Sequence, residues 1–224
     1  MIVHYINKQE HDKALKKVTE IKDEVKRNET MLRYASIFVN KCAKLAIEEL
    51  KKPKYRKIEI AKLMPAFMNI QEGNDMKVAL EYITNFCINH RNSKSKTVHN
   101  MAFFFHSKIN DPKRMIEFLE SEEIKKSKGH PIYFEVDYAL NICKQKEKEL
   151  MDELNLKRLA ASRIHSTGNA AENALTQKSE AEIAKLRTQS QDMKKAQIII
   201  YAILNHFDKA VKIALECQDV EMAK

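Results

Sequence analysis

The sequence contains very few of the residues that interrupt helices. Glycine occurs three times and proline four times in 224 residues, and tryptophan is absent. Glycine and proline punctuate strands and turns, so their scarcity predicts helices joined by short polar corners. Alanine, leucine, isoleucine, lysine, glutamate and methionine dominate, and most of these favour a helix. The composition therefore predicts an all-α fold.

Long hydrophobic runs and cysteine pairs are also missing. The longest apolar run, residues 198–204, is far shorter than the ~20 residues that a membrane span needs. No signal-peptide pattern opens the chain, so any membrane association is expected to be peripheral or through partners. The four cysteines are far apart and form no C-x-x-C motif, which predicts small buried residues in a reducing compartment. They are Cys42, Cys87, Cys143 and Cys217.

Sequence motifs for catalysis and cofactor binding are absent. With only three glycines, most phosphate-cradling loops are impossible, and neither G-x-x-x-x-G-K-S/T, G-x-G-x-x-G nor G-x-S-x-G occurs. The eight histidines form no H-E-x-x-H motif and no zinc spacing with cysteine. His99 and His106, seven residues apart, are expected to be structural rather than metal-binding. We therefore expect no enzyme, no catalytic or metal-binding residue and no cofactor.

The chain is basic, with 40 Lys and Arg against 31 Asp and Glu and a net charge of +9. Such a balance is compatible with nucleic acid, an acidic membrane or an acidic partner protein. The charges are interspersed, however, and the densest basic stretch, residues 51–57, contains one aromatic residue and no RNA-recognition motif. The preferred interpretation of this stretch is a solvated lysine-rich corner, and a nucleic-acid site is the less favoured alternative.

One sequence pattern recurs along the chain. An aromatic or apolar residue opens a short helix, a polar corner with Asp or Asn follows, and a second helix carries small and large apolar residues. The clearest copies begin at Tyr5, Phe67, Phe104 and Tyr201. A repeated helical hairpin cannot bury its apolar face alone and stacks on its neighbours. The pattern predicts an α-solenoid, a class of proteins that mostly serve as scaffolds and provide binding surfaces.

The spacing of the second helices supports the repeat. These helices align on Ala14, Ala46, Ala79 and Met115, at steps of 32, 33 and 36 residues. The steps lie within the ~30–45 residues of helical-hairpin repeats. Gly73 and Asn74 are expected to form a corner, and Asp111 with Pro112 a helix start. The expected helix pairs are 3–8 with 12–25, 30–39 with 43–50, 58–71 with 75–89, and 97–109 with 112–121.

The apolar residues of these helices are assigned to packing. The run Phe103–Phe105 is expected to face partly the core and partly the next repeat, rather than to form a partner pocket. The ten methionines fit gap-filling in the core, and a promiscuous binding groove is the minority interpretation.

The repeat breaks after Cys143 and resumes at Ile198. Between them the chain is polar, and the helices predicted at 150–164 and 170–186 have too few apolar residues to look like core. We interpret this segment as an inserted loop, partly disordered or forming a projecting helical arm. The predicted organisation is helical hairpins of the solenoid at 1–143, a polar charged insertion at 144–197, and a final, truncated hairpin at 198–224.

Three stretches, taken in order, are more specific than the repeat alone. The first is KLMPAFMN at 62–69 with 79–87, the second VHNMA at 98–102 with 111–119, and the third YFEVDYALNIC at 133–143, completed by 200–215 and 219–224. The order and the residue patterns of these stretches resemble the α-solenoid region of the vacuolar protein sorting-associated protein 18 (deep orange) family. The resemblance covers nearly the whole chain except the insertion.

The resemblance implies a scaffold segment of a HOPS/CORVET-type tethering subunit in endosome-to-lysosome or vacuole transport, vesicle docking and fusion. Implied partners are other class C vacuolar sorting subunits and, indirectly, SNARE or small-GTPase machinery, but no nucleic acid. The implied location is cytoplasmic and peripheral on late endosomal, lysosomal or vacuolar membranes. Family members also carry a β-propeller and a RING finger. This sequence has neither, which implies a middle fragment without ubiquitin-ligase activity.

Two alternatives stay open at this point. One is another trafficking solenoid, such as a clathrin-like or intraflagellar-transport repeat, because these repeats share the same pattern of residues in their helical hairpins. The other is a basic helical-repeat module that binds nucleic acid, for which binding should weaken steeply as salt rises. The sequence names no partner-binding residue for any of the three.

Overall fold

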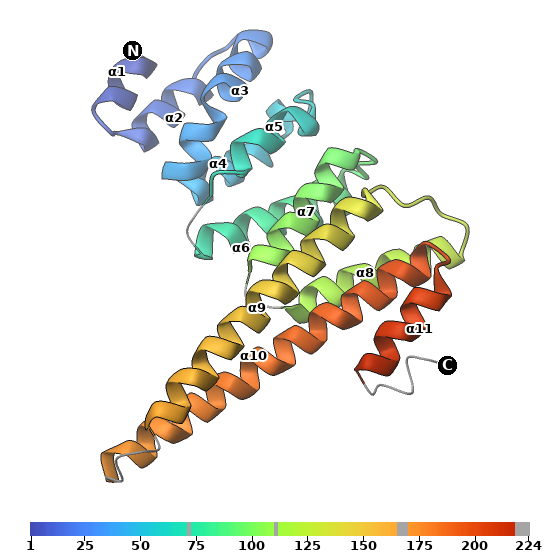
Figure 1. Ribbon diagram of the computed structural model, residues 1–224. Helices are drawn as coiled ribbons and strands as arrows, with labels where there is room; N and C mark the ends of the chain where they lie inside the picture. Colours follow the sequence, from blue (N-terminus) through green and yellow to red (C-terminus); the bar gives the residue numbers. More distant parts are fainter. Residues whose placement is uncertain (71–72, 110–111, 165–169, 218–224) are drawn as a thin grey trace. The chain divides into compact units, whose positions relative to one another are not determined.

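The computed structural model describes residues 1–70, 73–109, 112–164 and 170–217, with side chains described outside 162–164 and 170–178. Within these ranges every regular element is helical and no strand occurs (Figure 1). The predicted all-α fold is therefore confirmed. The chain divides into two compact units, Met1–Ile109 and Asn110–Lys224, which are described separately below.

Unit 1 is a stack of helical hairpins. From α2 onward, a helix contacts the helix two places further along the chain, so that α2 packs on α4, α3 on α5, α4 on α6 and α5 on α7. This contact pattern is that of a solenoid, in which each hairpin lies against its neighbours. The helices are α1 (Ile2–Asn7), α2 (His11–Thr19), α3 (Glu24–Lys41), α4 (Ala43–Leu50), α5 (Ile60–Phe67), α6 (Gly73–Glu81) and α7 (Lys96–Lys108), with a 3₁₀ turn η1 (Pro53–Tyr55) and a π-helical segment η2 (Tyr82–His90).

Small residues lie at the centres of the second helices. Ala14, Ala46 and Ala79 are completely buried, and so is Met115 at the aligned position in unit 2. An alanine at such a position lets neighbouring helices approach closely, whereas a larger residue would have to displace them. The alignment on these four residues, made from spacing alone, is therefore confirmed as an alignment of core positions.

The predicted connection between the helices at 12–25 and 30–39 is displaced. The predicted helix 12–25 ends at Thr19, and α3 begins at Glu24 instead of residue 30. The cause is Asp23, whose side chain accepts a hydrogen bond of 2.7 Å from the backbone N–H of Lys26. This contact caps α3 and makes 20–23 the corner. Residues 26–29, which lie between the two predicted helices, are inside α3.

The predicted corner at Gly73 and Asn74 is also wrong, because both residues belong to the first turn of α6. The preceding helix, predicted to extend to residue 71, ends at Phe67, two residues after Pro65. Pro65 lies inside α5, so its missing N–H affects the preceding turn and does not by itself set the end of the helix at Phe67. Residue 71 itself lies outside the described residues. The helix predicted at 75–89 changes to π-helical geometry from Tyr82 onward.

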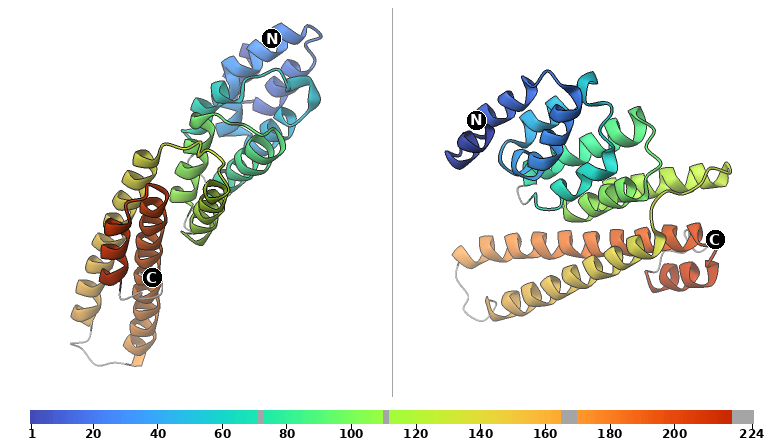
Figure 2. Two further views of the ribbon diagram at one scale, coloured as in Figure 1. Left: turned by 90° about the vertical axis from the view of Figure 1, so that its right-hand side faces the viewer. Right: turned by 90° about the horizontal axis from the view of Figure 1, so that it is seen from above.

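Unit 2 consists of α8 (Pro112–Ser127), α9 (Val136–Ile164), α10 (Ala170–Ile203) and α11 (Phe207–Glu216). Helices α9 and α10 lie side by side along most of their length, and α10 also contacts α8 and α11 (Figure 2). The helix predicted to start at Pro112 does so, whereas the capping role of Asp111 lies outside the described residues.

A lysine of α8 fastens the end of α10. The ammonium group of Lys126 donates hydrogen bonds to the backbone oxygen of Ile203 and, at 3.4 Å, to the side-chain oxygen of Asn205. Asn205 has a φ of 59°, in the left-handed region that commonly ends helices. The charge of Lys126 also lies at the negative end of the helix dipole. These contacts fix the corner that leads into α11.

The polar segment 144–197 contributes to the core of unit 2. Helix α9 runs without a break through residue 144, and α10 runs through residue 197. Leu150, Leu154, Leu186 and Met193 are 2–7% exposed. The expectation that this segment has too few apolar residues to form core is therefore wrong. The division of the chain at residues 143 and 197 itself stays a prediction, and residues 165–169 lie outside the described part.

The cysteines are buried or half-buried, as expected of core residues. Burial raises the pKa of the thiols of Cys42, Cys87 and Cys143 to about 12. Thiols with such pKa values stay protonated at neutral pH and are poor nucleophiles. Among the described helices, none is both long and apolar enough to cross a bilayer.

The alanines of α11 provide a test of helix packing. Ala210 and Ala214 are buried, with Ala214 fully inaccessible, whereas Lys212 on the same helix is exposed. We expect Ala214→Lys to lower the free energy of unfolding by about 3 kcal/mol, because it both overpacks the site and buries a charge. Lys212→Ala is the matched control and should change stability by less than about 0.5 kcal/mol. Urea unfolding followed by circular dichroism measures both, and wild-type stability in Ala214→Lys would contradict this packing.

Candidate interaction surfaces

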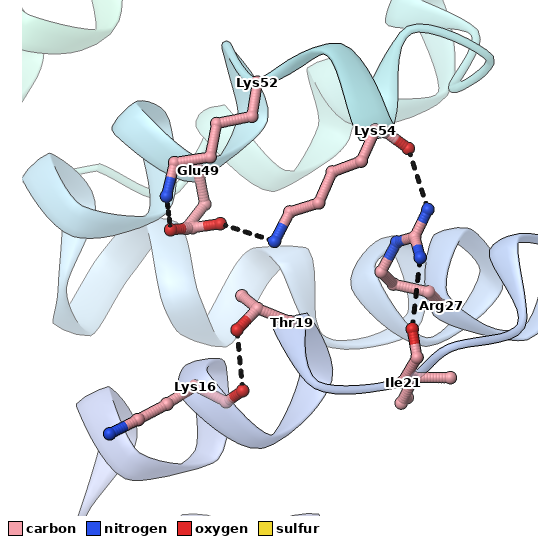
Figure 3. A network of polar contacts seen from close by, with 7 residues as sticks. All are labelled: Lys16, Thr19, Ile21, Arg27, Glu49, Lys52 and Lys54. Carbon is pink, nitrogen blue, oxygen red and sulfur yellow. Dashed lines mark hydrogen bonds and ion pairs between the residues drawn. The ribbon is translucent and has the colours of Figure 1, made fainter.

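The corner between α4 and α5 is held by arginines from both sides. The guanidinium of Arg27, which is 9% exposed, donates hydrogen bonds of 3.1 Å to the backbone oxygens of Ile21 and Lys54 (Figure 3). From the other side, Arg91 donates to the backbone oxygens of Arg56 and, at 3.5 Å, Ile58. We call residues 49–58 together with Arg27 and Arg91 the corner clasp. It connects three successive hairpins of unit 1.

A half-buried carboxylate lies beside this corner. Glu49 accepts hydrogen bonds from the ammonium groups of Lys52 and, at 3.2 Å, Lys54 (Figure 3). Burial by itself would raise the pKa of Glu49, but the hydrogen bonds and charges of the two lysines outweigh it and hold the pKa below its usual value. The ionised form of Glu49 therefore stabilises the fold.

The single aromatic residue of the basic stretch is buried. Tyr55 is 1% exposed, and its ring centroid lies 5.7 Å from the guanidinium carbon of Arg27 and 5.3 Å from the ammonium of Lys54. Both distances are within the range of cation–π contacts. Burial, reinforced by the charge of Glu49 and opposed by Arg27, raises the pKa of Tyr55 to about 12. Tyr55 is therefore a neutral anchor of the corner.

The stretch 51–57 is thus an ordered connection whose lysines pair with carboxylates. The interpretation as a solvated lysine-rich corner is only partly correct, because Lys54 is half-buried and the run is tied to its neighbours. Buried Tyr55 cannot stack on a base, which is the contact that single-stranded nucleic acid would need. The ion pairs are Lys51–Glu48 at 2.8 Å, Lys52–Glu49, Lys54–Glu49 at 3.2 Å and Lys57–Glu24 at 3.0 Å.

The histidines and phenylalanines of α7 are mainly core residues. His99 and His106 are 2% and 7% exposed, and His99 Nε2 lies 2.9 Å from the backbone oxygen of Ser93, where it holds the preceding corner. Phe103 and Phe105 are fully buried. In the part of the chain that the structure describes, no three His, Cys, Asp or Glu side chains are grouped as metal ligands.

A groove lies between α9 and α10. Its charges have both signs, and Lys157 pairs with Glu182 across it at 2.6 Å. Further along the two helices, Gln197 donates to Glu147 at 2.6 Å. The groove contains no nucleophile beside a base, so its chemistry suits contact with another protein surface rather than catalysis. Its volume is about 400 Å³, and it is lined by Lys146, Leu150, Glu153, Lys157, Glu182, Lys185, Leu186 and Gln189.

Helix α11 exposes an apolar stripe that sequence reasoning missed. Phe207, Val211 and Leu215 are 61%, 37% and 61% exposed and follow one another at a spacing of four residues. They lie beside Ala210 and Ala214, which are buried. The sequence does carry a signal for this stripe. The apolar residues of the helix, which are the three of the stripe and the two alanines, span a face too wide for one contact with α10 to cover. A stripe of this kind is typical of a surface that a further helix covers.

The family comparison matches most of the described fold. Residues 1–152 match the protein-family model described as VPS18, alpha-solenoid domain, second half. The matched range covers all of unit 1 and ends inside α9. Neither the search of curated proteins nor the search of solved structures returned a match.

The corner clasp predicts a specific dependence of stability on pH. Since the pKa of Glu49 is lowered in the folded state, its contribution is present above the ordinary value of 4.5 and is lost as pH falls through the folded-state pKa. We expect Glu49→Gln to destabilise the protein at neutral pH, and the difference from wild type to shrink in acid. Urea unfolding at several pH values between about 7 and 3 measures this difference.

The control for this experiment is Glu59→Gln. Glu59 pairs with Lys62 at 3.1 Å, but both side chains are more than 60% exposed, so the substitution should have little effect at any pH. A difference between wild type and Glu49→Gln that stays constant across the pH range would contradict an ionised, stabilising Glu49.

Proposed function

The chain belongs to the VPS18 family, and from this premise we propose that it is a scaffold segment of a HOPS/CORVET-type membrane-tethering subunit. In this role it serves vesicle docking and fusion during transport from endosomes to the lysosome or vacuole. The observation that carries the proposal is the match of residues 1–152 to the family's α-solenoid domain.

The packing of unit 1 supports a mechanical role. From α2 onward, helices pack on the helix two places further along, and the corner clasp links successive hairpins through partly buried hydrogen bonds. A stack joined in this way transmits force between neighbouring hairpins, because moving one hairpin breaks contacts with the next. A tether needs such a segment to hold its other parts at defined positions.

The proposed partners are other class C vacuolar sorting subunits, with SNARE or small-GTPase machinery contacted through them. The proposed location is peripheral on late endosomal, lysosomal or vacuolar membranes. Two surfaces of unit 2 are suited to subunit contacts. One is the apolar stripe Phe207, Val211 and Leu215, and the other is the charged groove between α9 and α10.

Affinity purification from native cells tests this function. The tagged full-length protein is isolated and the proteins that accompany it are identified by mass spectrometry, with the tag alone as control. Enrichment of other class C vacuolar sorting subunits over the control is the expected result. Recovery of clathrin, ciliary transport proteins or RNA in their place would reject the proposed tether role while leaving the solenoid fold unaffected.

A further inference from the structure

The net positive charge of the chain comes entirely from one unit. Residues 1–109 contain 21 Lys and Arg against 12 Asp and Glu, which gives the whole net charge of +9. Residues 110–224 contain 19 of each and are neutral. Within unit 1 no acidic residue follows Glu81. An acidic partner would therefore be attracted to unit 1, and its last corner in particular.

That corner joins η2 to α7 and lies against the corner clasp. Arg91 begins it and donates hydrogen bonds to the backbone oxygens of Arg56 and Ile58. Lys94 and Lys96 follow within the same short connection, and their side chains, like that of Arg56, are exposed. We define these four cations, Arg56, Arg91, Lys94 and Lys96, as the basic corner.

The preceding corner, residues 51–58, shows how unit 1 pairs an exposed cation with a carboxylate. Glu24, the first residue of α3, reaches Lys57 across the stack at 3.0 Å. One hairpin later Glu59, the residue just before α5, lies one position earlier relative to its helix than Glu24 does, and it pairs with Lys62 of α5. Among the described residues no carboxylate forms an ion pair with a cation of the basic corner. In the described part of the chain, the basic corner therefore has no ion-pair partner of the kind that Glu24 provides for Lys57.

The surroundings of the basic corner favour carboxylates over other anions. The buried ring of Tyr55 cannot stack on a base, and the exposed ring of His90, next to Arg91, is already stacked on Phe86 with ring centroids 5.4 Å apart. None of the exposed large apolar residues among the described positions lies in 51–58 or 91–96, so nothing there can insert into a lipid surface. The corner presents the exposed cations Arg56, Lys94 and Lys96, the hydrogen-bonded Arg91, and the hydroxyls of Ser93 and Ser95.

We propose that the basic corner docks an acidic segment of a partner protein, whose carboxylates take the place that Glu24 occupies beside Lys57. Contacts of this kind steer association and set specificity, and salt weakens them. The inference goes beyond the proposed scaffold role, because it holds for any complex that the chain joins. Its failure would leave the co-purification result untouched.

A binding assay on the full chain tests the proposal. The probe is a fluorescein-labelled 20-residue peptide rich in glutamate, followed by fluorescence anisotropy at low salt, and the same peptide with glutamine for glutamate is the uncharged reference. The test variant is Lys94→Glu with Lys96→Glu. The matched control is Lys41→Glu with Lys44→Glu, which changes the net charge equally at exposed positions of the corner between α3 and α4.

We expect the glutamate peptide to bind and the glutamine peptide not to bind. The test variant should weaken binding about tenfold, and the control variant less than about twofold. Lys94→Gln with Lys96→Gln should weaken binding in the same direction, and it replaces the charge reversal if circular dichroism shows a folding defect. Equal weakening by the test and control variants would show a general effect of net charge and overturn the proposal.

Two further outcomes would also overturn it. One is the absence of binding to the glutamate peptide at low salt. The other is tighter binding to a 20-nucleotide oligouridylate, or to vesicles containing phosphatidylserine, that the test variant abolishes. Either result would show that the basic corner is not a site for carboxylates.

Discussion

The stack of hairpins in unit 1 depends on how the corners between them satisfy their backbone oxygens. Where a connection is buried against its neighbours, its backbone oxygens need hydrogen bonds, because an unsatisfied buried carbonyl costs about 1–3 kcal/mol. The corner at residues 51–58 is partly buried, through Tyr55 and Ile58. At residues 51–58 the partners come from arginines of the hairpins before and after. The same contacts hold Tyr55 and the ion pairs of Glu49 in place, so hydrogen bonding, burial and charge are coupled at one corner.

Close helix packing supplies the rest of the stability. The buried alanines Ala14, Ala46 and Ala79 recur at the repeat spacing, and they allow each second helix to approach the next. Apolar packing sets how near the hairpins lie, whereas the arginines of the corner clasp fix how they are joined. A segment with both properties is suited to hold the parts of a larger assembly, which agrees with the family to which the chain belongs. It also leaves the exposed corners available for charged partners.

The repeat was predictable from the sequence because helical hairpins leave a local periodic pattern, and the four aligned positions were found in this way. The corner at 20–23 was not predicted, since a single capping residue, Asp23, decided it against a longer polar run. The core of α9 and α10 was missed because its buried residues are spread over two long helices, each mostly polar. The corner clasp was hidden for a different reason: Arg27 and Lys54 are 27 residues apart, and only the fold brings them together.

Hydrogen exchange at this corner tests the central claim most directly. The amides of Tyr55 and Ile58 form backbone hydrogen bonds within the corner, and their exchange reports how often it opens. If Arg27 holds the corner, Arg27→Ala should speed the exchange of these two amides about tenfold, whereas the exposed neighbour variant Lys26→Ala should not. Exchange in Arg27→Ala that is unchanged at the corner, or accelerated equally throughout α1 to α7, would contradict the account.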